Sequence, residues 1–207
     1  TSHPKDLSDG LIDAIAGLPK VCEHIHLAVQ SGDDEILERM NRGYSSEHIR
    51  ERVGALRSAV PDIAITTDFL VGFPEETDSQ FENTMLLIQE LRFDAAFMFA
   101  FNPIPKTAAA AMSDQISPDI KNKRLNQLIK VQNAITCEIN DSCVGKTYDV
   151  LVEGISPKDP GRLTGLTRQN KTVNFPGSKD LVGRQVGVRA TEGHLYGFVG
   201  VNNQSGK

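Results

Sequence analysis

Cysteine is scarce in this sequence, and long apolar runs are absent. The 207 residues contain three cysteines, Cys22, Cys137 and Cys143, and no Cys-x-x-Cys pair. An odd and widely spaced set does not form a disulfide framework, so it favours a reducing cytoplasm over secretion. No stretch of 18 apolar residues occurs, which predicts that no part of the chain spans a membrane.

An amino-terminal targeting signal is also missing. Residues 1–6 are polar and lack the apolar centre of a signal peptide. Position 1 is not an initiator methionine either. We therefore expect that the chain begins inside a longer protein or has been processed.

Charge is unevenly distributed along the chain. Residues 1–144 hold 13 lysines and arginines against 22 aspartates and glutamates, a net charge of −9. Residues 145–207 hold 9 against 5, a net charge of +4. A basic end on an acidic body indicates two domains, the second a candidate for binding polyanions. An ordinary surface imbalance explains the +4 equally well.

Hydrophobic periodicity predicts alternating helices and strands in the first 144 residues. This alternation favours parallel strands joined by crossover helices, as in α/β proteins. We expect strands at 24–29, 63–71 and 93–101, and helices at 7–18, 33–40, 46–60 and 117–143. A further helix is expected to begin at a capping box formed by Thr77.

After Val144 the pattern changes to short strands with glycine or proline at most of the turns. Five short strands in succession indicate a small closed barrel, because closure removes exposed strand edges. The strands are expected at 146–153, 162–168, 171–175, 184–192 and 195–201.

Polar clusters follow the predicted strands of the first part. In α/β folds, ligands bind at the carboxyl ends of strands, where loops and helix N-termini converge. Each cluster is therefore a candidate binding loop, although ordinary turn chemistry explains such residues as well. The clusters are Gln30-Ser31-Gly32, Thr66-Thr67-Asp68 continuing into residues 72–77, and residues 102–105.

Asp68 interrupts an apolar run, so we expect it inside the sheet or at its rim, where a carboxylate needs a partner or a ligand.

His24 and His26 alternate along one strand and share a face. No cysteine or carboxylate lies near them at metal-ligand spacing, so we interpret both as structural histidines. Cys137 and Cys143 fall on different faces of one helix and are interpreted as structural too.

Several motifs, in the right order, resemble the radical S-adenosylmethionine (SAM) methylthiotransferases. The first part carries HLAVQSG at 26–32, MNRGY at 40–44 and TTDFLVGFPEET at 66–77. The second part is similar to the C-terminal TRAM domain of that family, through VEG at 152–154, KDPG at 158–161, LTGLTRQN at 163–170 and VNF at 173–175.

The resemblance implies a fold and a subfamily. Residues 1–144 would be the C-terminal half of a partial (βα) radical SAM barrel. Residues 145–207 would be a small all-β, OB-like TRAM barrel that binds RNA. The NKTVNF strand at 170–175 resembles the MiaB type, which converts isopentenyladenosine beside the tRNA anticodon to its 2-methylthio form. The ribosomal-protein methylthiotransferases are a weaker match.

The resemblance also implies cofactors and partners: SAM, two [4Fe-4S] clusters, tRNA and an electron donor, for a cytoplasmic transferase. The Cys-x-x-x-Cys-x-x-Cys motif that would hold the SAM-cleaving cluster does not occur in the sequence. No metal ligand and no catalytic residue is therefore assigned, and we expect the chain alone to be inactive.

Candidate binding residues follow from the same resemblance. Gln30 and Ser31 would lie near the ribose or methionine end of SAM, and Arg39 and Arg42 would bind its carboxylate, because arginine pairs with carboxylates bidentately. The residues expected to flank the adenosine are Thr67, Asp68, Gly72 and Phe73. The residues expected to contact tRNA phosphates are Arg162, Arg168 and Lys171.

Two readings from other classes stay open. The chain could be a non-enzymatic RNA-binding module, a small barrel on a degenerate half-barrel. It could also be an unrelated barrel lyase in which Asp68 and Glu76 perform acid–base chemistry.

Overall fold

The structure is a computed structural model that describes residues 2–202. The chain divides into two compact units. The first unit contains the residues up to Leu18 together with Ile25–Ile135. The second contains the short segment Pro19–His24 and the residues from Thr136 onward.

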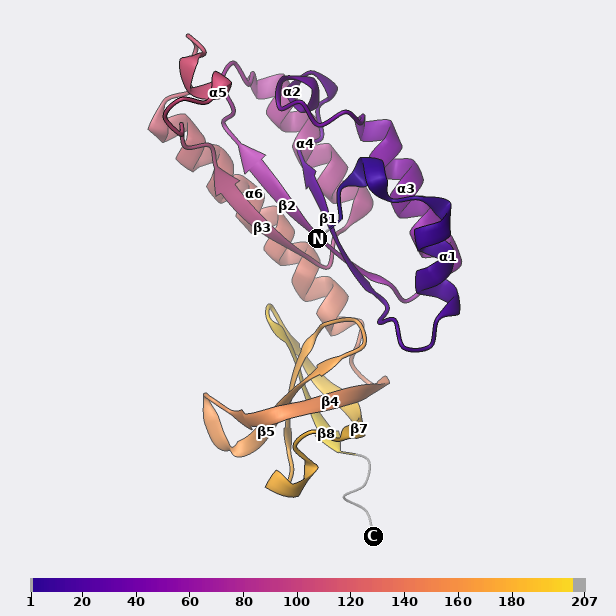
Figure 1. Cartoon of the computed structure of the whole chain (residues 1–207). Helices are drawn as coiled ribbons and strands as arrows, with labels where there is room; N and C mark the ends of the chain where they lie inside the picture. Colours follow the sequence, from indigo (N-terminus) through magenta and orange to yellow (C-terminus); the bar gives the residue numbers. More distant parts are fainter. Residues whose placement is uncertain (1, 203–207) are drawn as a thin grey trace. The chain divides into compact units, whose positions relative to one another are not determined.

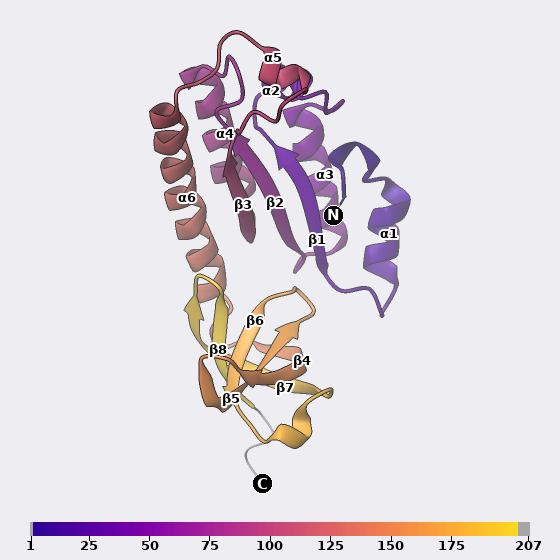
Figure 2. The ribbon, with the colours of Figure 1, turned by 60° about the vertical axis from the view of Figure 1, so that its left-hand side comes forward.

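The first unit is built on a three-stranded sheet in the order β1-β2-β3, with β2 and β3 parallel. Helices α3, α4 and the first part of α6 lie behind this sheet in Figure 1, and the other face is turned toward the viewer. Figure 2 shows α2 and α5 at the edge where the strands end. The elements are η1 (Pro4–Asp6), α1 (Asp9–Gly17), β1 (His24–Gln30), α2 (Asp34–Arg39), α3 (Ser46–Ala59), β2 (Ala64–Val71), α4 (Asp78–Leu91), β3 (Ala95–Ala100), α5 (Ala108–Ala111) and α6 (Pro118–Asp141).

The two faces of the sheet have opposite character because side chains alternate along a strand. On β2, Thr67, Phe69 and Val71 are fully buried on the helix-covered face. Thr66 and Asp68 point to the other side and are only partly buried. The buried face packs on apolar side chains of the helices, including Ile36, Ile49, Leu56, Leu87 and Ile88.

Side-chain caps begin the helices where the sequence predicts them. Ser8, Asp33 and Ser45 each accept a hydrogen bond from a backbone N–H in the first turn of the helix that follows. Thr77 and Gln80 form the predicted capping box of α4. At the outer edge of β1, the backbone of Ser2 exchanges hydrogen bonds with His26 and Ala28.

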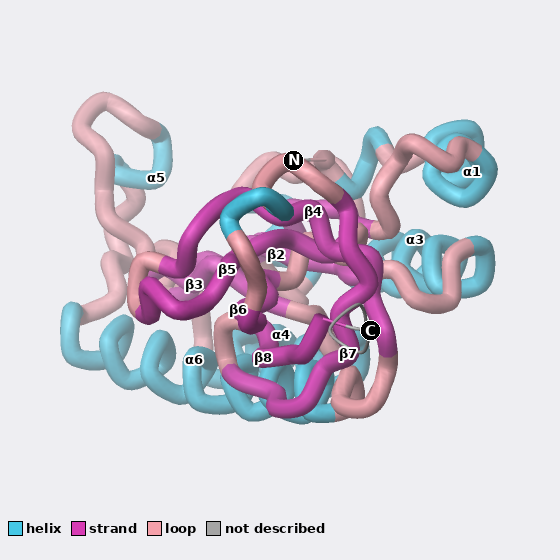
Figure 3. The backbone as a smooth tube through the Cα atoms, turned by 90° about the horizontal axis from the view of Figure 1, so that it is seen from below, coloured by secondary structure: helices cyan, strands magenta, loops and turns pink. Residues whose placement is uncertain are grey.

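The second unit contains a closed barrel of five strands in the order β4-β5-β6-β8-β7. Figure 3 looks along the barrel, and the five strands follow one another around it. The parallel pairing of β6 with β8 completes the closure. The elements are β4 (Thr147–Ser156), β5 (Asp159–Thr167), β6 (Thr172–Pro176), η2 (Lys179–Leu181), β7 (Gln185–His194) and β8 (Gly197–Asn202).

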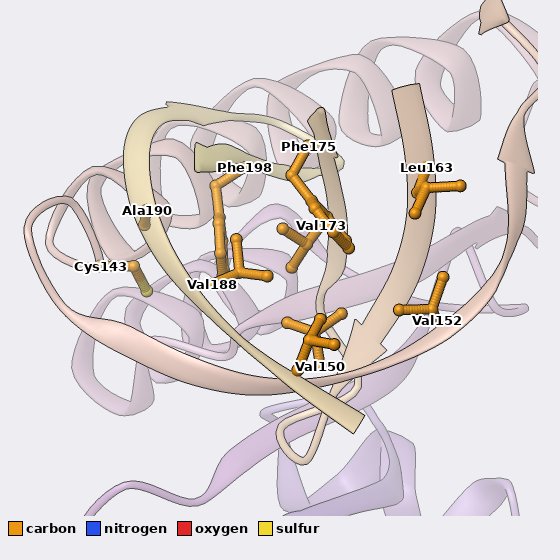
Figure 4. Packing of buried hydrophobic residues seen from close by; sticks show 10 residues of the cluster. Cys143, Val150, Val152, Leu163, Val173, Phe175, Val188, Ala190 and Phe198 are labelled. Atoms are coloured by element: carbon orange, nitrogen blue, oxygen red, sulfur yellow. The ribbon is translucent and has the colours of Figure 1, made fainter. Parts of the chain in front are cut away.

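Alternate side chains of the five strands fill the barrel. Val150, Val173, Phe175 and Val188 are fully buried and point toward one another in Figure 4. Cys143 joins this apolar cluster, as expected for a structural cysteine. The backbones of β4 and β5 come very close at Gly165. Only glycine fits there, because a Cβ would collide with the carbonyl oxygen of Leu151 on β4.

The predicted α/β part and the predicted small barrel are both present, with shifts at element ends. β5 begins at Asp159, because the Ser156–Asp159 pair closes a tight hairpin. β8 begins at Gly197 instead of 195, because residues 195 and 196 form a turn closed by the pairing of His194 with Gly197. The short elements η1, η2 and α5 were not predicted, since three or four residues show no periodicity.

A buried ion pair joins the turn before α4 to α6 within the first unit. The Glu76 carboxylate accepts hydrogen bonds from Nη1 of Arg124 and from the Gly72 N–H, both at 2.7 Å. The side chains of Glu76 and Arg124 are 1% and 6% exposed. Burial raises the pKa of Glu76, while the Gly72 N–H and the Arg124 charge oppose that change. Nη2 of Arg124 also donates to the exposed Asp78 at 2.8 Å, so Glu76 is the buried one of two carboxylates that balance the Arg124 charge.

Glu76→Gln is therefore expected to destabilise the first unit by about 3 kcal/mol, since it removes the buried one of the two carboxylates that pair with Arg124 and leaves only the exposed Asp78. Glu90→Gln is the matched control: Glu90 pairs with Arg50, but its side chain is 51% exposed, and such a pair contributes less than about 1 kcal/mol. Urea unfolding of both variants measures the difference. Equal losses would contradict the assignment of Arg124 and Glu76 as a structural pair.

Candidate functional site

The open face of the sheet carries one polar cluster, centred on His26 of β1. Nδ1 of His26 lies 3.0 Å from Oγ1 of Thr66, and Nε2 lies 3.1 Å from Oδ2 of Asp68. Thr66 and Asp68 are two residues apart on β2, so both face His26 across the strand pair. The pairing of the two strands thus brings His26 together with two side chains that lie 40 and 42 residues later in the chain.

The carboxylate of Asp68 sets the direction of its hydrogen bond with His26. An ionised carboxylate only accepts hydrogen bonds, so Nε2 of His26 donates to Asp68. Nδ1 of a neutral imidazole then accepts from the Thr66 hydroxyl. Oδ1 of Asp68 makes no hydrogen bond to a described residue, so it is available as an acceptor.

Two exposed aromatic rings border this cluster. Phe97 and Phe99 of β3 are 62% and 54% exposed. In the strand register Phe97 lies opposite Asp68, and its ring centre is 5.9 Å from that of His26. An acceptor oxygen beside flat apolar rings suits a planar ligand with N–H donors, such as a purine.

Among the residues expected to bind SAM, Gln30 and Arg42 also have unused polar groups. Gln30 ends β1 with φ = 72°, and its side chain makes no hydrogen bond to a described residue. Nε of Arg42 is buried without a hydrogen-bond partner in the described part of the chain. The Arg42 charge acts on Tyr44, whose hydroxyl donates to the Ala28 and Val29 carbonyls, so Arg42 lies near the end of β1.

Four other expected SAM residues are occupied by packing. Ser31 is buried, with its hydroxyl 3.2 Å from that of Thr84. Thr67 is buried on the helix-covered face, opposite Asp68, and its hydroxyl accepts from the Val29 N–H. Phe73 is buried against Phe101. Gly72 adopts φ = +71°, and a Cβ there would collide with the side chain of Lys121, so its missing side chain makes room for that lysine.

Arg39 is held by carboxylates. Its guanidinium lies 3.6 Å from Glu35 and 3.5 Å from Glu75. Glu76, proposed above as an acid–base partner of Asp68, is buried in the Arg124 pair and has no access to a substrate. The barrel-lyase reading is therefore wrong.

In the barrel, Arg168 is already paired. Its guanidinium makes hydrogen bonds of 2.7–3.0 Å to both carboxylate oxygens of Glu23 and one of 2.6 Å to the Val21 carbonyl. These bonds lower the pKa of Glu23 and raise that of Arg168. Arg168 therefore fixes the segment Pro19–His24 to the barrel within the second unit.

The other expected RNA contacts have partners too. Nε of Arg162 lies 3.1 Å from Asp159, and Nζ of Lys171 donates to Oδ1 of Asn140 at 3.0 Å. By contrast, Lys146 and Arg189 are exposed and make no side-chain hydrogen bond or ion pair to a described residue. Their backbones are close, because Ala190 exchanges backbone hydrogen bonds with Gly145 and Lys146 and Arg189 pairs with Thr147.

Sequence reasoning missed the link between His26 and Asp68 and overlooked the Lys146–Arg189 pair. The signal for the first was available: both residues interrupt apolar positions on strands expected to be neighbours. Within residues 2–202, no group of three or more histidine, cysteine, aspartate or glutamate side chains is placed to hold a metal ion. Nor does any helix in that range combine the length and apolar composition needed to cross a bilayer.

Comparison with known proteins agrees with these features. Residues 1–88 match the Radical SAM superfamily, and residues 141–196 match the TRAM domain. The chain thus combines a region similar to radical SAM proteins with a region similar to TRAM domains. This composition confirms the predicted fold class, a piece of a radical SAM barrel followed by a small β-barrel. Coproporphyrinogen III oxidase (HemN) from Escherichia coli, described as a radical SAM enzyme, has a similar fold, with a TM-score of 0.55 at 17% identity over 80% of this chain and 45% of that one.

Three similar sequence relatives share one description. The chain is 50% identical to tRNA-2-methylthio-N(6)-dimethylallyladenosine synthase of Thermoanaerobacter pseudethanolicus over 93% of its length. It is 45% identical to the synthase of Carboxydothermus hydrogenoformans over 97%, and 47% identical to that of Moorella thermoacetica over 95%. These matches confirm the resemblance predicted from the motifs. The chain spans less than half of these relatives, between 41% and 46% of their lengths.

The Glu23–Arg168 pair predicts a pH dependence. Because the pKa of Glu23 is lowered in the folded state, the pair stabilises the attachment of Pro19–His24 above the ordinary value of 4.5, and this stabilisation disappears as the pH falls through the folded-state pKa. In Arg168→Gln, the Glu23 titration midpoint should rise toward 4.5. Carboxyl-carbon NMR measures it, with Arg189→Gln as the control. An unchanged Glu23 midpoint in Arg168→Gln would contradict the pairing.

Proposed function

We propose that this chain is part of a tRNA methylthiotransferase that adds a methylthio group to isopentenyladenosine next to the anticodon. The observation that carries the proposal is the open sheet face of the radical SAM region, where Asp68 offers a free acceptor oxygen beside Phe97 and Phe99. A transferase acting on an adenine with SAM handles two adenine rings, and this face suits such rings. The partners would be tRNA, SAM and an electron donor, in the cytoplasm.

The residues present fit SAM. Arg42 is partly exposed and makes no ion pair with a described residue, so its guanidinium suits a carboxylate. Gln30 can donate to or accept from the ribose or the methionine end at the carboxyl end of β1. Asp68 can accept from the adenine amino group or from a ribose hydroxyl. Bound SAM would supply the radical and the methyl group, while these side chains hold and orient it.

Ser31, Thr67, Gly72 and Phe73 would support the same site indirectly. Ser31 and Thr67 fix the end of β1 through their hydrogen bonds, and Phe73 and Gly72 fix the turn after β2. Arg39 would reach SAM only by exchanging its glutamate partners for the ligand carboxylate.

The residues present do not fit an iron–sulfur cluster. The sequence has no Cys-x-x-x-Cys-x-x-Cys motif, and no metal-binding group of side chains occurs in residues 2–202. No step is therefore assigned through either [4Fe-4S] cluster. We expect this chain alone to hold none and to leave SAM uncleaved.

We propose residues 145–207 as the RNA-binding domain, with the boundary between Val144 and Gly145. Its net charge of +4 suits a polyanion. Lys146 and Arg189 join Arg162, Arg168 and Lys171 as phosphate contacts. Lys146 and Arg189 can bind phosphate more readily than the other three, because neither has to break a hydrogen bond or ion pair with a described residue.

The RNA part of the proposal predicts a loss of tRNA affinity in Lys146→Glu/Arg189→Glu. Each phosphate contact releases counterions, so the double variant should bind about tenfold or more weakly and should show a shallower salt dependence. The control is Lys123→Glu/Lys130→Glu, an equal charge change on exposed residues of α6. Filter binding at several salt concentrations measures both. Equal effects in the two variants would show that only net charge matters.

The SAM part predicts weaker cofactor binding in Asp68→Asn. Loss of a charged acceptor should reduce the affinity of the chain for SAM about tenfold. Asp62→Asn, on an exposed aspartate before β2, should leave it unchanged. Isothermal titration calorimetry of both variants with SAM measures this. If Asp68→Asn binds SAM as well as the parent chain does, Asp68 is not part of the site.

A further inference from the structure

The hairpin between β7 and β8 ends in an exposed aromatic ring. His194 pairs with Gly197, which leaves Leu195 and Tyr196 as the two turn residues. Tyr196 is 82% exposed, the highest value among the large hydrophobic side chains of residues 2–202. Its ring makes no hydrogen bond or aromatic contact to another described residue, so it contributes little to the packing of the barrel.

The backbone around this ring is nevertheless held firmly. A Cβ at Gly197 would collide with the carbonyl oxygen of Thr172, and a Cβ at Gly193 with Asn140 and Asp141. Nδ2 of Asn140 also donates to the His194 carbonyl at 2.7 Å. The turn is therefore fixed on two sides by close backbone approaches and by a side-chain hydrogen bond.

We infer that Tyr196 is a stacking platform for an unpaired base of bound RNA. Because the backbone of the turn is already fixed, stacking of a base has to order only the tyrosine side chain itself, which has two rotatable bonds. Proteins that bind single-stranded nucleic acid combine such rings with cationic side chains along the backbone path. A cation lies close to this turn, since Nζ of Lys171 donates to Oδ1 of the same Asn140. The inference rests on the proposed RNA binding of the barrel and names one residue that would select unpaired over paired RNA.

Binding of two probes tests this inference with the whole chain. The probes are a fluorescein-labelled single-stranded RNA of mixed sequence and the same RNA annealed into a duplex, which offers phosphates but no unpaired bases. Tyr196→Ala should weaken binding of the single strand about tenfold and leave duplex binding unchanged. Tyr196→Phe, which keeps the ring, should bind the single strand like the parent chain. Val182→Ala removes exposed apolar surface elsewhere on the barrel and should change neither affinity.

Intrinsic fluorescence gives a second readout. The chain has three tyrosines and no tryptophan. Tyr44 is partly buried, with its hydroxyl bonded to backbone carbonyls, and Tyr148 packs on Phe198 in the barrel. Stacking on Tyr196 should therefore quench tyrosine emission when the single strand binds, and Tyr196→Phe should lose most of that quenching.

The outcomes separate the inference from the proposed function. If the parent chain binds neither probe, the RNA-binding proposal itself fails. If the parent chain binds the single strand and Tyr196→Ala binds it equally well, the stacking role is overturned. An equal loss on single strand and duplex also overturns it, because a damaged barrel affects both.

Discussion

The alternation of side chains along β2 decides what the first unit can do. Thr67, Phe69 and Val71 face the helices and are fully buried, so they hold the sheet. Thr66 and Asp68 face the other way and meet His26. A shift of one residue in this strand would put a carboxylate into the apolar core and a valine on the open face. The buried phenylalanine and valine thus fix the position of the polar cluster.

Much of the fold could be predicted because its causes are local. Thr77 and Gln80 form a capping box that the sequence displays directly, and the turns around the barrel strands carry visible glycines and prolines. The site was less predictable. Thr67 and Asp68 were expected to flank one ligand, yet neighbours in a strand face opposite sides. The His26–Asp68 contact depends on the register between two strands, which no local pattern specifies.

The charged residues show the same limit. Counting lysines and arginines identifies the basic barrel, but it does not show which cations are already paired. Arg168 was the natural choice for an RNA contact, because it follows a strand in a motif-rich stretch. Glu23, 145 residues earlier in the chain, binds that guanidinium with both oxygens. Burial and pairing, which are tertiary properties, separate Arg168 from the exposed Lys146 and Arg189.

In both units, a side-chain group without a partner among the described residues lies beside a well-held part of the backbone. In the first unit, this backbone is the pairing of β1 with β2, and the unused atoms are Oδ1 of Asp68 and Nε of Arg42. In the second unit, close glycine approaches hold the β7–β8 turn while the ring of Tyr196 stays in solvent. A side chain that is left without a protein partner beside a fixed backbone is available to a ligand, and the ligand binds more tightly because fewer residues have to be ordered on binding.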